Sequence, residues 1–142
     1  MAEIIYQATH CAASPCYSHI EWLGENDSVK LNEHLILAGQ KPMKDKRFRE
    51  FYQKRIAYYC LLYHDNLPVA RGAVEPYSEQ AWEAADIRTV FAYRRQGYAT
   101  EILRFLTQHI LAQGKIATCR TEEHNIAMQK AIYTVGYKEM DK

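Results

Sequence analysis

Membrane-spanning segments are absent from the sequence. The longest apolar run covers residues 56–63, far short of the roughly 20 residues that cross a bilayer. The N-terminus also lacks the basic, apolar and small-residue regions of a secretory signal peptide. We therefore expect a soluble cytoplasmic protein without a membrane partner.

An excess of charge of one sign is also absent. Eighteen lysines and arginines face seventeen aspartates and glutamates, which gives a net charge of +1. This balance argues against a surface field that attracts nucleic acid. Residues 41–55 are a local exception, because they hold seven basic residues among aromatic ones. Such a run is usually a solvated helix face, so nucleic-acid binding is a weaker alternative and we expect no nucleic-acid partner.

Cysteine is scarce, with four in the whole chain. A small secreted domain held by disulfides would carry more of them. Cys60 and Cys119 lie in apolar stretches, which is typical of buried positions. The other two lie between histidines in residues 10–19, at a spacing that fits no common zinc motif. We predict a polar loop there and no bound metal. The four side chains concerned are His10, Cys11, Cys16 and His19.

The composition that remains is that of one globular domain. The chain has 142 residues, of which 48% are hydrophobic and 25% charged. No internal repeat or low-complexity tract divides it. We expect residues 1–142 to form a single domain.

Hydrophobic periodicity predicts a mixed α/β fold around a partly antiparallel sheet. Residues 64–68 have turn chemistry and join two strands into a hairpin. The predicted strands cover residues 3–8, 56–63, 69–75, 82–89 and 116–119. The predicted helices cover residues 28–38, 44–55, 99–113 and 125–135.

The loop at residues 93–100 has the composition of an anion site. It follows a predicted strand, contains two arginines and Gly97, and runs into a helix. The unpaired N–H groups and the dipole of a helix N-terminus attract a pyrophosphate, and a glycine lets the ligand approach the backbone. The segment matches neither the dinucleotide fingerprint nor the P-loop. A tight turn with solvated arginines is the alternative.

Two segments resemble signatures of the GNAT superfamily of N-acetyltransferases. Residues 87–99, with the sequence IRTVFAYRRQGYA, resemble motif A together with its strand and helix. Residues 119–137 resemble the second signature, in which an asparagine (Asn125) opens the last helix and a tyrosine (Tyr133) follows eight residues later. The resemblance covers about residues 56–137. The first fifty residues match only in outline, as a strand and two helices.

The resemblance implies a GNAT-like fold, with a mostly antiparallel sheet, one splayed pair of parallel strands and helices on both faces. It implies that acetyl-CoA is the co-substrate and binds where strands 82–89 and 116–120 splay apart. The loop amides would hold the pyrophosphate, and backbone groups of the first strand would pair with the pantetheine arm. Asn125 would contact the same arm, or would serve only as a helix N-cap. The implied binding residues are Ile87, Thr89, Arg94, Arg95, Gln96, Gly97, Tyr98, Ala99, Thr100 and Asn125.

The resemblance also implies the reaction, which is direct attack of a primary amine on the acetyl thioester. The acceptor would be a small molecule or a peptide. Tyr133 would protonate the departing CoA thiolate. The last helix carries polar residues at steps of four, namely Asn125, Gln129 and Tyr133. This polar line favours a tyrosine that faces a ligand over a core tyrosine whose hydroxyl reaches solvent.

A general base must accept a proton from the attacking amine. Some GNAT members carry a glutamate whose counterpart here is Glu83. By strand alternation we expect Glu83 to share a face with Ile87 and Thr89, and Asp86 to point the other way. Glu75 on the hairpin and a water relay are the other candidates.

The chain is short after its last predicted helix. Only six residues follow Gly136, whereas most GNAT domains continue with further strands that wall the acceptor site. We expect this wall to be missing or supplied by another subunit, which leaves a homodimer open. The alternative function is a non-catalytic CoA-binding module that senses or regulates, which would not need Glu83 or Tyr133.

Overall fold

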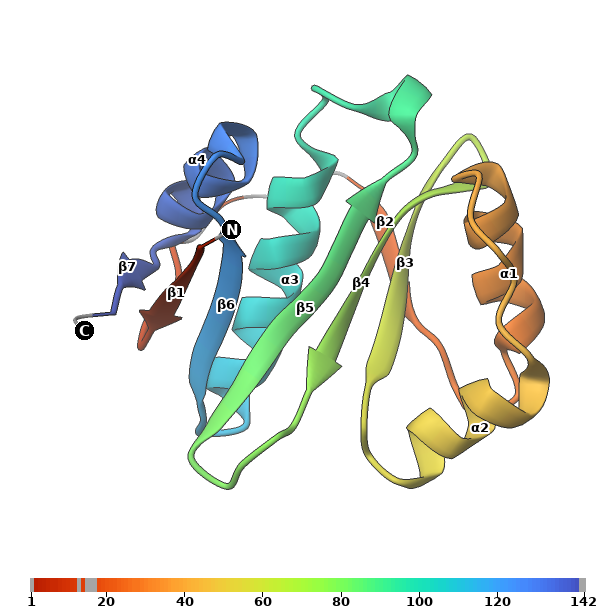
Figure 1. Cartoon of the computed structure of the whole chain (residues 1–142), viewed down its shortest axis with the longest axis horizontal. Helices are drawn as coiled ribbons and strands as arrows, with labels where there is room; N and C mark the ends of the chain where they lie inside the picture. The colour runs from red at the N-terminus through yellow and green to blue at the C-terminus, as the bar shows by residue number, and fades with distance from the viewer. Residues whose placement is uncertain (1, 13, 15–17, 141–142) are drawn as a thin grey trace.

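The computed structural model describes residues 2–12, 14 and 18–140, and these form a mixed sheet covered by helices (Figure 1). The strands are β1 (Glu3–Ala8), β2 (His19–Trp22), β3 (Tyr58–His64), β4 (Leu67–Glu75), β5 (Ala81–Thr89), β6 (Ile116–Glu122) and β7 (Lys138–Glu139). The α-helices are α1 (Ser28–Leu37), α2 (Asp45–Gln53), α3 (Tyr98–Ala112) and α4 (Ile126–Val135). A 3₁₀ turn, η1 (Phe91–Tyr93), precedes α3. The strand order is β2-β3-β4-β5-β6-β1-β7, and β5 and β6 form a parallel pair.

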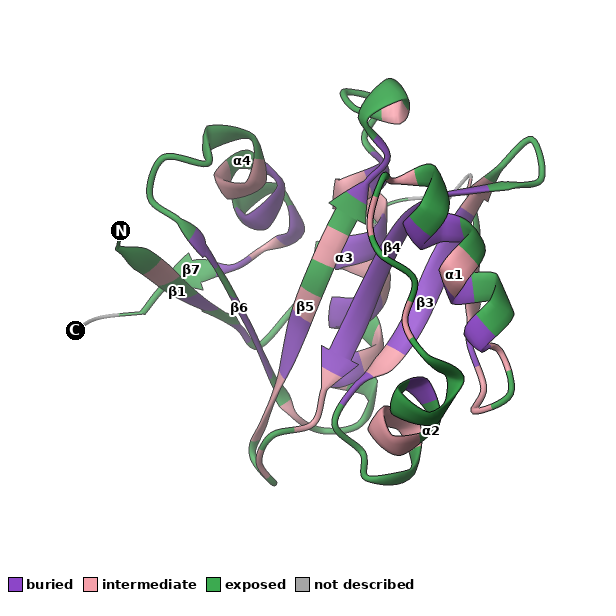
Figure 2. Cartoon of the chain, turned by 45° about the vertical axis from the view of Figure 1, so that its right-hand side comes forward, coloured by how far each residue is buried: buried purple, intermediate pink, exposed green. Residues whose placement is uncertain are grey.

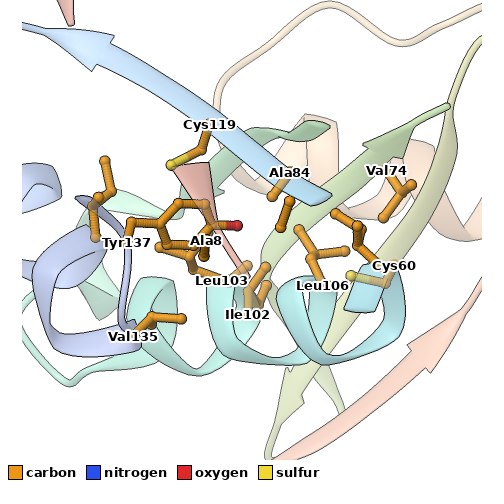
Figure 3. Close-up of a cluster of buried hydrophobic side chains, with 14 of the residues drawn as sticks. Ala8, Cys60, Val74, Ala84, Ile102, Leu103, Leu106, Cys119, Val135 and Tyr137 are labelled. Carbon is orange, nitrogen blue, oxygen red and sulfur yellow. The ribbon is translucent and has the colours of Figure 1, made fainter. Parts of the chain in front are cut away.

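The helices lie on both faces of the sheet, as expected. The core beneath α3 and α4 contains Ile102 and Leu106 of α3, which point toward the strands (Figure 3). A second core lies beneath α1 and α2 and contains Leu31, Phe48 and Leu61. Figure 2 shows β4 buried along nearly its whole length between these layers. A strand that is covered on both faces has a nearly continuous apolar sequence. The sequences of β3 and β4 have this character.

The predicted strands and helices are all present, with small differences at their ends. Two short strands, β2 and β7, were not predicted. β2 has only four residues, His19–Trp22. Its pairing with β3, and not a pattern in its own sequence, makes it a strand. β7 has two residues and pairs with β1. Strands of this length carry too few residues for a recognisable alternation.

β1 lies beyond β6 in the sheet. β1 pairs antiparallel with β6, with Tyr6 opposite Cys119, and does not pair with the hairpin. β2 takes the sheet edge next to β3 instead. The chain's own N-terminal strand therefore continues the sheet past β6. The expectation that the wall of the acceptor site is missing or supplied by another subunit stays a prediction.

Gly72 on β4 allows α3 to pack directly against the sheet. A Cβ atom at this position would lie 2.5 Å from Cγ2 of Ile102 and 2.9 Å from Cδ1 of Leu106. We expect Gly72→Val to lower the free energy of unfolding by about 3 kcal/mol through overpacking, as measured by urea denaturation. Gly24→Ala is the control, because its Cβ would meet only Oδ2 of Asp27, at 3.5 Å. Equal stability of the two variants would contradict this packing.

Candidate active site

The parallel strands β5 and β6 pair only where they begin. Residues 81–83 of β5 pair with residues 116–118 of β6, and no pairing is recorded farther along these two strands. Figure 1 shows the two strands separating toward the ends that lead into η1 and α4. Their facing backbone edges are therefore available to an extended ligand, which could bind as an added strand does.

A β-bulge in β5 accompanies this separation. The register between β4 and β5 shifts between Arg71, which faces Arg88, and Ala73, which faces Ala85. β5 thus holds one more residue than β4 across this interval. Asp86 lies in the bulge with a φ of +50°. A bulge bends a strand and increases its twist, which turns the end of β5 away from β6.

The bulge also changes the face of the sheet on which the side chains after Asp86 lie, relative to strict alternation from Glu83. Asp86 hydrogen-bonds to Arg71 and Tyr59 on the face covered by α1. Ile87 packs into the core beneath α3. Glu83 lies opposite Glu75 of β4 and shares the α1 face with Asp86. The expectation that Glu83 shares a face with Ile87 and Thr89 is therefore wrong, because alternation was counted without the extra residue.

A buried arginine holds the bulge in place. Nη2 of Arg71 lies 2.9 Å from Oδ1 of Asp86, and Nε lies 3.2 Å from Oδ2. The same guanidinium donates to Gln40 and lies 3.2 Å from Nε2 of His34. Nδ1 of His34 lies 2.8 Å from the carbonyl oxygen of Pro68, so Nδ1 carries the proton and Nε2 accepts from Arg71. Burial lowers the pKa of His34, which favours this neutral form.

Two glutamates lie side by side at the point where β5 and β6 part. The buried Glu83 pairs with Arg120 of β6, with Nη2 of Arg120 3.1 Å from Oε1 and Nε 3.2 Å from Oε2. Glu75 is half-buried, and its side chain makes no hydrogen bond to a described residue. Burial raises the pKa of Glu75, and the carboxylates of Glu83 and Asp86 add to this effect. Arg120 acts on the pKa of Glu75 in the opposite direction, but its guanidinium is paired with Glu83.

The backbone of the loop before α3 leaves a row of N–H groups open. Nε of Arg94 donates to the carbonyl oxygen of Thr89 at 3.3 Å. Arg95 and Gly97 have φ angles of +67° and +83°, and such alternation of backbone conformation makes a concave row of N–H groups. The backbone N–H groups of residues 95–100 donate no hydrogen bond to any of the residues described. A Cβ on Gly97 would have no atom within 4 Å, so this side of the loop is open.

The other predicted loop residues lie around the start of α3. Arg94, Arg95 and Gln96 are exposed, and Tyr98, the first residue of α3, is buried. Ala99 and Thr100 are half-buried in its first turn. The structure therefore brings the predicted loop residues together at one helix N-terminus.

The last helix presents Tyr133 on its open side. The Tyr133 side chain is 53% exposed. Asn125 is the N-cap of α4, and its Oδ1 accepts from the N–H of Met128 at 3.1 Å. Gln129 donates to the carbonyl oxygen of Glu123 at 2.6 Å. Asn125 and Gln129 thus have structural hydrogen bonds within the chain.

Sequence reasoning missed Arg71, Arg120 and Tyr6. Arg71 and Arg120 are charged residues inside otherwise apolar or uncharged strand segments, and such a position indicates a buried or half-buried ion pair. That signal could have found both arginines. Tyr6 gives no such signal, because a tyrosine is an ordinary strand residue.

No group of three metal-ligating side chains exists among the residues described. Cys16, one of the four side chains singled out in residues 10–19, lies outside the described residues. None of the helices described has the length and apolar character needed to cross a bilayer.

The fold thus combines a splayed parallel strand pair with a loop of exposed N–H groups that opens a helix. The family model described as acetyltransferase (GNAT) family matches residues 20–137, and the chain belongs to this family. The match begins at β2, so β1 lies outside it. No curated protein matches the sequence.

Solved structures of GNAT acetyltransferases have the same fold. A GNAT acetyltransferase from Colwellia psychrerythraea aligns with a TM-score of 0.76 and 22% identity, over 96% of this chain and 52% of that chain. A GNAT acetyltransferase from Novosphingobium aromaticivorans gives 0.73 and 16%, over 97% and 59%. AAC(6')-Iy in complex with a CoA bisubstrate analogue gives 0.70 and 12%, over 89% and 95%. The chain thus spans little more than half the length of the first two.

Proposed function

We propose that this chain transfers an acetyl group from acetyl-CoA to a primary amine, which attacks the thioester directly. The row of unpaired N–H groups at residues 95–100, beside the splayed end of β5, is the observation that carries this proposal. A similarly folded protein, AAC(6')-Iy, binds a bisubstrate analogue that contains CoA, which supports the same use of the fold here.

Acetyl-CoA binds along the splayed strands in this proposal. The N–H groups of residues 95–100 hold the pyrophosphate, and the arginines Arg94 and Arg95 add positive charge. The backbone of Ile87 and Thr89 pairs with the pantetheine arm. An N–H group near Thr89 polarises the thioester carbonyl as negative charge develops on its oxygen. Asn125 contacts the pantetheine arm with the part of its side chain that the helix cap leaves unused.

Glu75 is the better placed of the two candidate bases. A protonated amine must lose its proton before it attacks, and an efficient base has a pKa near the working pH. The raised pKa of Glu75 suits that task, and its side chain makes no ion pair with a described residue. Glu83 is already engaged with Arg120, and its role is to hold β5 and β6 together where they part. Tyr133 protonates the CoA thiolate as it leaves.

The pH dependence separates the two carboxylates. A base acts only when ionised, so kcat/KM should fall as the pH drops through the raised pKa of Glu75. We expect Glu75→Gln to remove this acidic limb and to lower kcat about a hundred-fold. Glu83→Gln should keep the limb. Loss of the limb in Glu83→Gln alone would assign the base to Glu83, and a limb kept in both variants would point to a water relay.

Binding of CoA tests the proposal as a whole. Ligand that binds only the folded state raises the melting temperature, so millimolar CoA should raise the Tm by several degrees. Gly97→Ala should reduce this shift, because its methyl group narrows the open side of the loop. Thiol release from acetyl-CoA with a panel of amines then measures transfer. No thermal shift would contradict the proposal, and a shift without thiol release from any amine would favour a CoA-binding module.

A further inference from the structure

The N-terminal strand brings Tyr6 directly against Tyr133. Tyr6 lies on β1 opposite Cys119 of β6, and its side chain is fully buried in the core beneath α3 and α4. The ring centroids of Tyr6 and Tyr133 are 5.7 Å apart, and the ring planes meet at 89°. A residue from the start of the chain therefore supports the tyrosine that the proposed reaction uses as its acid.

The hydroxyl group of Tyr6 has no structural partner. It is buried and makes no hydrogen bond to any residue in the part of the chain described. Tyr137, in the same core, differs in this respect, because its hydroxyl lies 2.7 Å from Oγ1 of Thr107. A buried hydroxyl without a partner lowers stability. Phenylalanine would thus fill the position of Tyr6 at least as well as tyrosine, if packing were its only role.

The surroundings keep the Tyr6 hydroxyl protonated. Burial raises the pKa of Tyr6 to about 12, and the neighbouring Tyr133 is the next largest cause. Glu139 of β7 and Cys119 of β6 lie opposite Tyr6 on the neighbouring strands, and their charges raise its pKa further. Tyr6 therefore retains an O–H group to donate across the pH range in which Tyr133 would act.

We propose that Tyr6 is a positioning residue for Tyr133, and that it donates a hydrogen bond to the Tyr133 oxygen when this oxygen becomes negatively charged. The inference rests on the proposed acid role of Tyr133. In that step the CoA sulfur takes the proton of Tyr133, so an S–H bond forms and the O–H bond of Tyr133 breaks. Tyr6 keeps its own proton throughout, and water returns a proton to Tyr133 after CoA leaves. The hydrogen bond stabilises the negative charge that develops on the Tyr133 oxygen in this step.

The test is Tyr6→Phe in the full chain. We expect kcat to fall roughly ten-fold, as for the loss of a hydrogen bond to a charged group, with no change in the dissociation constant for CoA. A fall in kcat without a loss of CoA affinity distinguishes a positioning role from a merely structural one. The Tm should stay the same or rise.

Tyr137→Phe is the matched control, because it removes a buried hydroxyl from the same core. It should lower the Tm through the loss of the bond to Thr107 and leave kcat unchanged. An unchanged kcat in Tyr6→Phe would overturn the positioning role alone. Full turnover in Tyr133→Phe would overturn the acid role, and the positioning role with it. If both roles hold, Tyr6→Phe combined with Tyr133→Phe should be no slower than Tyr133→Phe.

Discussion

Replacement of Tyr133 by phenylalanine should lower turnover about a hundred-fold or more. The CoA thiolate needs a proton as it leaves, and the variant lacks only the hydroxyl that would supply it. The dissociation constant for CoA should hold, because the lost interaction matters mainly in the transition state. The Tm should change little, since the Tyr133 side chain is 53% exposed and its ring is retained. Steady-state thiol release and CoA titration measure the two quantities.

Tyr52→Phe is the control for this variant. Tyr52 lies on α2 and packs edge to face against Tyr58, with ring centroids 5.1 Å apart. It thus resembles Tyr133 in its aromatic contact, and its helix α2 lies apart from the separating ends of β5 and β6 (Figure 1). Turnover of Tyr133→Phe within about two-fold of the wild-type value would remove Tyr133 from the mechanism. Water or another group would then protonate the thiolate.

Replacement of Arg71 by methionine should lower the free energy of unfolding by about 3 kcal/mol. Methionine keeps much of the length of the side chain, but it leaves Asp86, Gln40 and Nε2 of His34 without their donor. The bulge in β5 also loses its anchor, so the strand end that would bind the pantetheine arm should become less ordered. We expect a weaker affinity for CoA together with the lower stability. Urea denaturation and CoA titration measure both effects.

Arg49→Met provides the comparison for a surface arginine. Nε of Arg49 lies 2.8 Å from Oδ2 of Asp45 on α2, in an exposed pair. Exposed pairs of this kind contribute about 0.5 kcal/mol or less. A loss in Arg71→Met as small as that in Arg49→Met would contradict the anchoring role of the buried network.

Much of the local structure follows from the sequence because its signals are local. Apolar residues at helical spacing predicted α1 to α4, and turn residues between two apolar runs predicted the β3–β4 hairpin. The loop before α3 was also predictable, since Gly97 and the arginines beside it adjoin a strand and a helix. The match of residues 20–137 to the GNAT family agrees with the motifs quoted from the sequence.

The side chains around Glu83 could not be placed in this way. Alternation along β5 predicts a face for each residue only while the strand is regular. The extra residue at Asp86 shifts the later side chains to the opposite face. No residue type in the segment marks a bulge, because Asp86 is an ordinary residue that adopts a left-handed conformation where Arg71 holds it.

The sequence by itself determined the helices, the hairpin, the loop at residues 93–100 and the position of Tyr133 eight residues after Asn125. Only the tertiary structure decided that β1 lies beside β6, that Arg71 anchors the bulge, and that Tyr6 meets Tyr133. The physical reason is the range of the interactions. Helices and tight turns form from neighbouring residues, whereas pairing between strands far apart in the chain depends on which surfaces remain to be buried once the rest of the sheet has formed.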